Sequence, residues 1–266
     1  VEQKDPDVLL FQADSLEFME YLIDYYPDGV FDMIFADPPY FLSNGGITCQ
    51  SGQMVSVNKG DWDASRGVLD NHHFNLTWLR YCQQLLKPNG TIWVSGTQHI
   101  IHSIGFAMQT LEYKLLNDIT WEKPAPPPNL SCRYFTHATE TIIWAAKNEK
   151  TKHFFDYKLM KQINKNRQMK SIWQIGAPSD SEKKFGKHPT QKPIGLLNRI
   201  ILASTKPGDL IFDPFSGSST TGVSAIRLGR KFIGCEIDEI FAKLSKKRLE
   251  NAIETLTTGL FDGLDN

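Results

Sequence analysis

The sequence predicts an α/β protein whose mostly parallel sheet carries helices on both faces. Short apolar runs alternate with helical patterns along most of the chain, which is the order typical of such sheets. Several runs are continuously apolar, as in parallel strands buried on both faces. The 266 residues, 41% of them hydrophobic, suffice for a sizeable core. No run of about eighteen apolar residues occurs, so we expect a cytoplasmic protein without a membrane span.

The N-terminal part contains two predicted strands with a helix between them. Residues 8–11 are apolar and end before Asp14, an N-cap signal for the helix that follows. Residues 31–36 form the second apolar run, which stops at Asp37-Pro-Pro-Tyr40 because prolines end strands and helices alike. Gly, Ser, Asn and Gln dominate residues 43–58, which predicts a long mobile loop.

The remainder of the chain continues the alternation, with one interruption in the middle. Four prolines within residues 124–128 break the pattern, and it resumes regularly only at residue 193. Further strands are predicted at residues 91–95, 115–121, 141–145, 209–213 and 231–237. Further helices are predicted at residues 75–86, 101–112, 193–204, 220–228 and 241–254.

The charge of the chain is unevenly distributed. The net charge is -1, but residues 147–192 hold twelve Lys or Arg against four Asp or Glu, a formal +8, so the rest carries -9. A basic segment on an acidic body is typical of a local surface for an anionic partner. A solvated lysine-rich surface explains it equally well. With its weak periodicity, the segment at about 147–187 is the candidate for an inserted target-recognition region.

A glycine-bearing turn near the C-terminus has the features of a nucleoside site. Asp213 ends a strand, Gly217 lies in the turn, and residues 220–228 form the next helix, whose start offers free N–H groups. Glu236 ends the following strand, where an acid can accept both hydroxyls of a ribose. The dinucleotide and phosphate-loop glycine patterns are both missing. An ordinary capped turn between strand and helix is the alternative.

The Asp37-Pro-Pro-Tyr40 tetrapeptide suits methylation of an exocyclic amino group. Such a nitrogen shares its lone pair with the ring, and two acceptors on its hydrogens would make it more tetrahedral and nucleophilic. The Asp37 carboxylate and the Pro38 carbonyl could be these acceptors, while the two prolines stiffen the turn. Tyr40 could stack on a base that has left the duplex. The alternative is a capped turn with a packed tyrosine.

With these motifs the chain resembles the β-group amino-methyltransferases of bacterial restriction–modification systems, in which the Asp-Pro-Pro-Tyr half also precedes the cofactor turn. The resemblance runs from Leu9 to about Leu249 and includes His188-Pro-Thr-Gln-Lys-Pro193. It implies one domain over residues 1–266, a circularly permuted, seven-stranded Rossmann-like methyltransferase sheet, and S-adenosylmethionine as cofactor. Ser219 stands where the family usually has glycine. The family motifs imply that the catalytic residues are Asp37, Pro38, Pro39 and Tyr40. The residues implied around the cofactor are Asp14, Lys192, Asp213, Phe215, Gly217, Ser218, Thr220 and Glu236.

A narrower resemblance concerns residues 36–46 and 129–137. These segments are similar to the second adenine-N6 DNA methyltransferase of GATC restriction systems, which tolerates single strands. The resemblance implies DNA as substrate, a cognate restriction endonuclease as system partner and a homodimer, because many family members dimerise. The residues expected to contact DNA are Arg133, Lys161, Lys165, Arg167 and Lys170, since Arg reads guanine and Lys mostly holds phosphates.

Other activities fit the residues less well. Cytosine-C5 methylation needs a cysteine that typically follows proline, and no cysteine of this chain does. Cytosine-N4 methylation uses the same tetrapeptide chemistry, although that group more often begins the motif with Ser. A catalytically inactive DNA-binding relative and a glutamine or RNA methyltransferase remain alternatives. The histidines and cysteines lack metal-ligand spacing, so no metal site is predicted.

Overall fold

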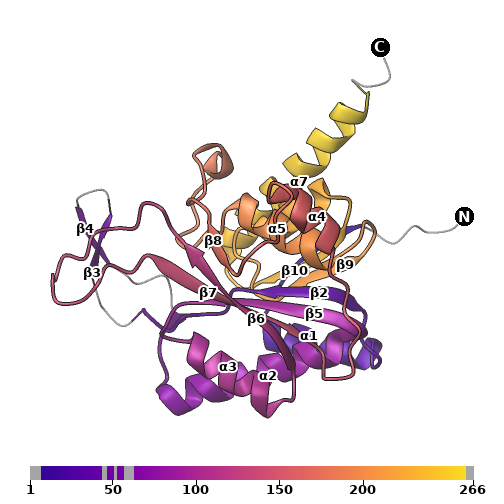
Figure 1. Ribbon diagram of the computed structural model, residues 1–266, viewed down its shortest axis with the longest axis horizontal. Coiled ribbons are helices and arrows are strands. Elements are labelled where there is room, and N and C mark those ends of the chain that lie inside the picture. The colour runs from indigo at the N-terminus through magenta and orange to yellow at the C-terminus, as the bar shows by residue number, and fades with distance from the viewer. Residues whose placement is uncertain (1–6, 44–46, 51–52, 57–62, 262–266) are drawn as a thin grey trace, which may run out of the picture.

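An eight-stranded sheet forms the centre of the protein, for which a computed structural model describes residues 7–43, 47–50, 53–56 and 63–261 (Figure 1). The strand order is β1-β10-β9-β2-β5-β7-β6-β8, and only β7 runs against the other strands of this sheet. The strands are β1 (Val8–Gln12), β2 (Phe31–Ala36), β3 (Ile47–Gln50), β4 (Gln53–Ser56), β5 (Leu86–Gly96), β6 (Lys114–Glu122), β7 (Thr139–Ala146), β8 (Ile172–Gln174), β9 (Leu210–Asp213) and β10 (Lys231–Glu236).

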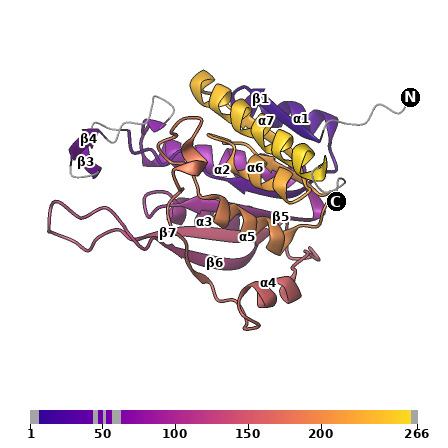
Figure 2. The same cartoon turned by 90° about the horizontal axis from the view of Figure 1, so that it is seen from above.

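Helices cover both faces of this sheet, as the alternation predicts (Figure 2). The helical elements are α1 (Ser15–Tyr25), α2 (Val68–Leu85), α3 (Ile101–Thr110), α4 (Tyr157–Ile163), the short 3-10 helix η2 (Ser181–Lys183), α5 (Ile194–Ser204), α6 (Thr220–Arg227) and α7 (Glu239–Phe261). One apolar core joins the sheet to α1, α2 and α3, and a second joins it to α5, α6 and α7. Asp14 caps α1 through hydrogen bonds from the backbone N–H groups of Leu16 and Glu17, as expected of an N-cap.

Two expectations require correction. The sheet has an eighth strand, β8, which lies inside the basic segment. This strand spans too few residues to show a periodicity in the sequence. It is anchored by the buried Trp173, whose strand partner is Trp121. Residues 43–58, expected to be a loop, contain the antiparallel hairpin of β3 and β4. Each of these two strands has four residues, again too few for an alternating pattern to be recognised.

The strand order creates a crevice at one edge of the sheet, here called the carboxyl edge, where β2, β5, β9 and β10 end. From the neighbouring strands β9 and β2 the chain continues in opposite directions, to β10 and to β5. Ligands of open α/β sheets bind at such a switch point, outside the carboxyl ends of the strands. The opposite edge is called the amino edge. No helix in the described part of the chain is long and apolar enough to cross a membrane.

Candidate active site

A pocket opens at the carboxyl edge between the ends of β2 and β9. The turn after β2 and the turn after β9 form its walls, so residues that are far apart in the sequence face one another. All twelve predicted catalytic and cofactor residues line it: Asp14, Asp37, Pro38, Pro39, Tyr40, Lys192, Asp213, Phe215, Gly217, Ser218, Thr220 and Glu236.

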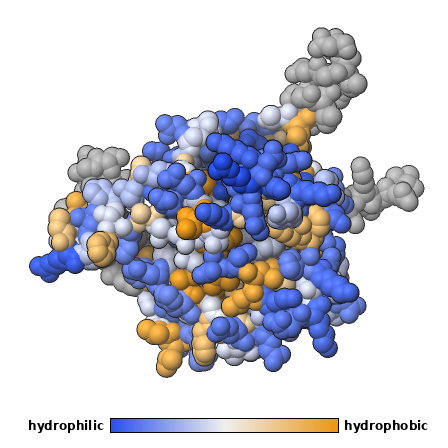
Figure 3. Space-filling model, in the orientation of Figure 1, coloured by the Kyte–Doolittle hydropathy of each residue, from blue (hydrophilic) through white to orange (hydrophobic). Residues whose placement is uncertain are grey.

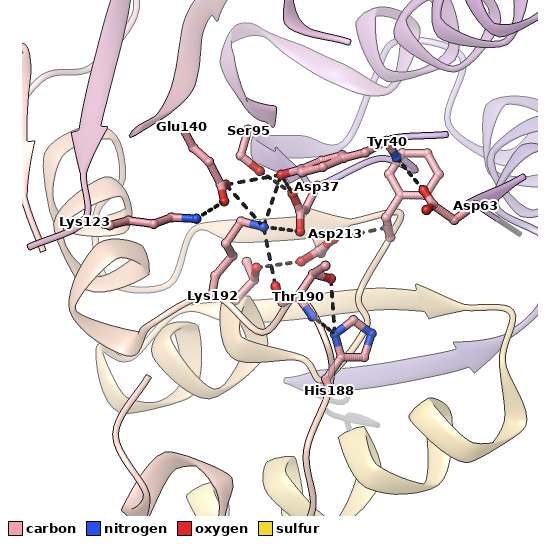
Figure 4. A network of polar contacts seen from close by, with 12 residues as sticks. Asp37, Tyr40, Asp63, Ser95, Lys123, Glu140, His188, Thr190, Lys192 and Asp213 are labelled. Atoms are coloured by element: carbon pink, nitrogen blue, oxygen red, sulfur yellow. Dashed lines mark hydrogen bonds and ion pairs between the residues drawn. The ribbon is translucent and has the colours of Figure 1, made fainter. Parts of the chain in front are cut away.

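Asp37 follows β2 directly and accepts hydrogen bonds from three side chains (Figure 4). Its Oδ1 accepts from the hydroxyls of Tyr40 at 2.7 Å and Ser95 at 2.5 Å, and its Oδ2 accepts from the Lys192 ammonium at 2.5 Å. A carboxylate offers about four lone-pair positions, so one further donor can be accepted. Asp37 is therefore equipped to receive a hydrogen from a substrate amino group.

Tyr40 is largely enclosed, because its side chain is only 6% exposed. Its hydroxyl donates to Asp37 and lies 3.2 Å from Glu140 Oε2. Burial and the two neighbouring carboxylates raise the pKa of Tyr40 well above its usual value, so the hydroxyl stays a donor. The Tyr40 ring lines the pocket, but only a small part of its surface is exposed for the predicted stacking on a base.

The family resemblance places Lys192 beside the cofactor, but its ammonium points at Asp37. It also lies 3.3 Å from the Tyr40 hydroxyl and 3.7 Å from Glu140, which in turn pairs with Lys123. Burial alone would lower the pKa of Lys192, but the carboxylates of Asp37 and Glu140 raise it. The side chain is therefore a buried cation shared between two carboxylates.

Asp63 fixes the turn that carries the tetrapeptide, a role that the sequence does not reveal. Its carboxylate is fully buried and accepts from the backbone N–H groups of Tyr40, Phe41 and Leu42 at 2.8, 2.8 and 3.2 Å. The Ser43 hydroxyl donates to the same carboxylate at 2.9 Å. Phe41 has a φ of 57°, an unfavourable conformation for a bulky residue that these bonds hold in place.

The cofactor half of the pocket contains two buried carboxylates. Asp213 accepts from the Thr221 hydroxyl at 2.6 Å and the Phe215 N–H at 3.1 Å, and burial raises its pKa to about 7. Glu236 accepts from the N–H groups of Gly217 at 2.7 Å and Asp238 at 2.9 Å, and burial raises its pKa as well. An ammonium and hydroxyl groups are the partners that such carboxylates favour.

The turn after β9 requires glycine at one position and strains a serine at another. Gly217 has a φ of 54°, and a Cβ there would lie 3.2 Å from the His188 ring. Ser219 adopts a similar φ of 52°, which is unusual for a residue with a side chain, and its hydroxyl contacts Ser216 at 2.7 Å. Arg248 from α7 donates to the Ser218 carbonyl and to the Thr220 hydroxyl, which stabilises the turn from behind.

The structure does not bring the five predicted DNA-binding residues together. Arg133 lies in residues 123–138, here called the arm, which leave β6 at the carboxyl edge and return in β7 (Figure 1). Lys161, Lys165 and Arg167 lie in or just after α4, on the side of the amino edge (Figures 1 and 2). The Asp156 N–H that precedes α4 donates to the Ala203 carbonyl at the end of α5. Lys170 lies two residues before β8, between these two positions.

Sequence reasoning missed several residues of the site because they belong to no motif. Ser95 is the last residue but one of β5, and Glu140 is the charged residue of β7, whose last five residues are apolar. A polar residue at the end of a parallel strand and a charge inside an apolar strand are both usable signals. Asp63 and Arg248 carry no comparable local signal, because their partners are backbone groups of distant turns.

A sheet of this topology, with a nucleoside-type acidic turn and an Asp-Pro-Pro-Tyr turn facing one pocket, is that of an amino-methyltransferase. The chain belongs to the DNA methylase family of N6 and N4 methyltransferases, whose model matches residues 31–247. It is 53% identical over 249 residues to the Type II methyltransferase M2.DpnII of Streptococcus pneumoniae, covering 93% of this chain and 91% of that protein. It is 55% identical over 244 residues to M2.LlaDCHI of Lactococcus lactis subsp. cremoris, covering 91% and 89%.

Solved structures agree with this assignment. The complex of M1.HpyAVI with S-adenosylmethionine superposes with a TM-score of 0.69 at 28% identity, covering 91% of this chain and 98% of that one. The cytosine-N4-specific PvuII methyltransferase shares the fold, with a TM-score of 0.69 at 22% identity, covering 92% and 89%. The protein is thus a DNA methyltransferase that uses S-adenosylmethionine, and the expected family, fold and cofactor are confirmed.

The residues present fit this cofactor. Two buried carboxylates, one of them with a pKa of about 7, match a ligand that has both an ammonium and ribose hydroxyls. A side chain at Gly217 would crowd the His188 ring, because its Cβ would lie 3.2 Å from that ring. Bound in this pocket, S-adenosylmethionine would supply a methyl group activated by its sulfonium.

Proposed function

We propose that the enzyme methylates the N6 amino group of adenine, with GATC as target, in single-stranded as well as double-stranded DNA. The observation that carries the proposal is the position of Asp37. Its carboxylate lies in the same pocket as the acidic cofactor turn and has room for one more donor. A methyl donor held by Asp213 and Glu236 and an amino group held by Asp37 would therefore face each other.

The proposed chemistry assigns a role to each residue of the tetrapeptide. Asp37 and the Pro38 carbonyl accept the two hydrogens of the amino group and localise its lone pair on nitrogen. The new bond joins nitrogen to the methyl carbon, and the electrons of the broken carbon–sulfur bond remain on sulfur. The nitrogen then loses one proton, for which Asp37 is the adjacent acceptor. Pro39 stiffens the turn, and the Tyr40 ring supports the base.

Base and sequence specificity rest on similarity to known enzymes. Residues 36–46 and 129–137 resemble the second adenine methyltransferases of GATC systems. The relatives M2.DpnII, M2.LlaDCHI and M2.MboI of Moraxella bovis are all Type II methyltransferases at more than 50% identity. A single strand avoids the few kcal/mol needed to flip a base from a duplex.

The test compares initial rates on matched single-stranded and duplex oligonucleotides with GATC intact or scrambled. We expect methyl transfer to adenine in both intact substrates and little in scrambled ones. Strict dependence on duplex rejects the single-strand claim, equal rates on scrambled sites reject GATC, and methyl on cytosine rejects the adenine assignment.

We assign the first contact with DNA to the arm. Residues 124–138 contain no Asp or Glu, and Phe135 and Tyr134 are 97% and 60% exposed beside the exposed Arg133. Hydrophilic and hydrophobic residues lie side by side at this tip, on the left of Figure 3. Exposed aromatic rings and an arginine suit unpaired bases and phosphates. The segment at about 147–187 is then a second contact, with Lys161, Lys165, Arg167 and Lys170 on flanking phosphates.

Short and long DNA distinguish the two contacts. The R133A/F135A variant should weaken binding to a short oligonucleotide that covers only the target. The K161A/K165A/R167A variant should weaken binding only to longer DNA, with a reduced salt dependence. Equal binding of the short oligonucleotide by wild type and R133A/F135A would reject the role of the arm.

The proposal includes a cytoplasmic homodimer that works with a partner restriction endonuclease. The relatives carry Type II methyltransferase names. Val68, Leu69 and Phe106 are 85%, 75% and 61% exposed, and apolar surface gathers over α2 and α3 at the lower edge of Figure 3. Such a patch suits a protein interface. Sedimentation of wild type and of the L69D/F106D variant tests this dimer. A monomeric wild-type protein would reject it.

A further inference from the structure

A row of alternating charges ends at the catalytic aspartate. Lys123, Glu140, Lys192 and Asp37 follow one another, each paired with the next (Figure 4). Lys123 stands just after β6, Glu140 lies in β7, and Lys192 precedes α5, so three separate segments bring these charges to the end of β2. Neither a motif nor the mechanism has supplied a role for Glu140 or Lys123, and Glu140 is the nearer of the two to the catalytic groups.

The row is ionised although it is enclosed. Burial opposes the charge on Glu140, but Lys192 and Lys123 lower its pKa below the usual value. The pKa of Lys192 is raised despite its burial, as described above. Glu140 is therefore a buried carboxylate with a formal charge, held 3.7 Å from the Lys192 ammonium and 3.2 Å from the Tyr40 hydroxyl.

Glu140 and Asp37 share the same two donors. The Lys192 ammonium lies 2.5 Å from Asp37 and 3.7 Å from Glu140, and the Tyr40 hydroxyl lies 2.7 Å and 3.2 Å from them. A donor that is drawn toward Glu140 neutralises Asp37 less. Because the amino group needs a carboxylate with a large residual negative charge, the partition of these donors sets how well Asp37 accepts.

We propose that Glu140 is a positioning residue that keeps Asp37 a strong acceptor by holding Lys192 and Tyr40 from the opposite side. Lys123, on the outer side of Glu140, limits this hold. The inference rests on the proposed function of Asp37 as the acceptor for the amino group. It predicts that loss of the Glu140 charge and loss of the Lys123 charge change the rate in opposite directions, which loss of structure would not produce.

The test measures single-turnover methyl transfer, together with the affinities for S-adenosylmethionine and for a GATC oligonucleotide. E140Q should lower the maximal rate roughly tenfold, within the usual coupling of contacting residues, and leave both affinities within about twofold. E140D, which keeps the charge, should restore part of the rate. K123M should raise the rate, because Glu140 then holds Lys192 more strongly. The control is E122Q, which makes the same Glu-to-Gln change as E140Q at a residue next to Lys123 but outside the row. This variant should match wild type.

The outcomes separate the inference from the proposed function. If D37A abolishes transfer while E140Q matches wild type, Asp37 keeps its role and the inference about Glu140 is wrong. Activity of D37A rejects the proposed function itself. If E140Q does not fold, K123M decides, because a rate well below wild type with unchanged affinities contradicts the inference.

Discussion

The buried Asp213 makes the stability of the protein depend on pH in a defined direction. Burial raises its pKa from the usual 3.8 to about 7, so between these values the folded protein holds a proton that the unfolded chain has lost. The free energy of unfolding then falls by about 1.4 kcal/mol per pH unit. The contribution of protonated Asp213 to the free energy of unfolding is fully present below pH about 4. It is lost as the pH rises through about 7, and the total loss is about 4 kcal/mol.

The D213N variant isolates this contribution, because the amide has the same shape and does not titrate. Its free energy of unfolding, minus that of wild type, should rise by about 4 kcal/mol between pH 4 and pH 8. Glu236 and Asp209 also have raised pKa values but are common to both proteins, so they cancel in the difference. Urea unfolding of both proteins at several pH values measures this difference in the free energy of unfolding. A difference constant to within about 1 kcal/mol over this range would refute the reasoning.

Substitutions at four further positions test the site. D37A should abolish methyl transfer while S-adenosylmethionine still binds, and D37N should cost roughly 10²–10³ in rate; near wild-type turnover of D37A would contradict the mechanism. E236A should weaken cofactor binding measured by calorimetry more than DNA binding, and unchanged cofactor affinity would place the ribose elsewhere. Y40F keeps the aromatic face and should have a mild effect, whereas Y40A should weaken productive binding by ~1–3 kcal/mol; equal effects would reject stacking. D63A leaves three backbone N–H groups without their acceptor and should destabilise the fold by about 3 kcal/mol in urea unfolding; a loss below about 0.5 kcal/mol would show that Asp63 does not hold the turn.

The sequence by itself determined the features that depend on neighbours along the chain. Apolar runs predicted seven strands of the eight-stranded sheet, several of them continuously apolar, because a strand buried on both faces needs apolar residues at successive positions. The Asp37-Pro-Pro-Tyr40 turn and the turn containing Gly217 were recognisable because their backbone geometry requires particular residues in order. Such local requirements also predicted the cap at Asp14, which the structure confirms.

Only the tertiary structure decided which distant charges meet. Lys192 pairs with Asp37 across 155 positions, and Glu140 reaches Tyr40 across 100, because strand order brings β2, β7 and the segment before α5 to one edge. No local pattern records such a pairing, since a buried charge is defined by the groups that pack around it. The same reason separates Arg133 from Lys161. Both are basic residues in the middle of the chain, but β7 runs from the carboxyl edge to the amino edge and so carries α4 away from the arm.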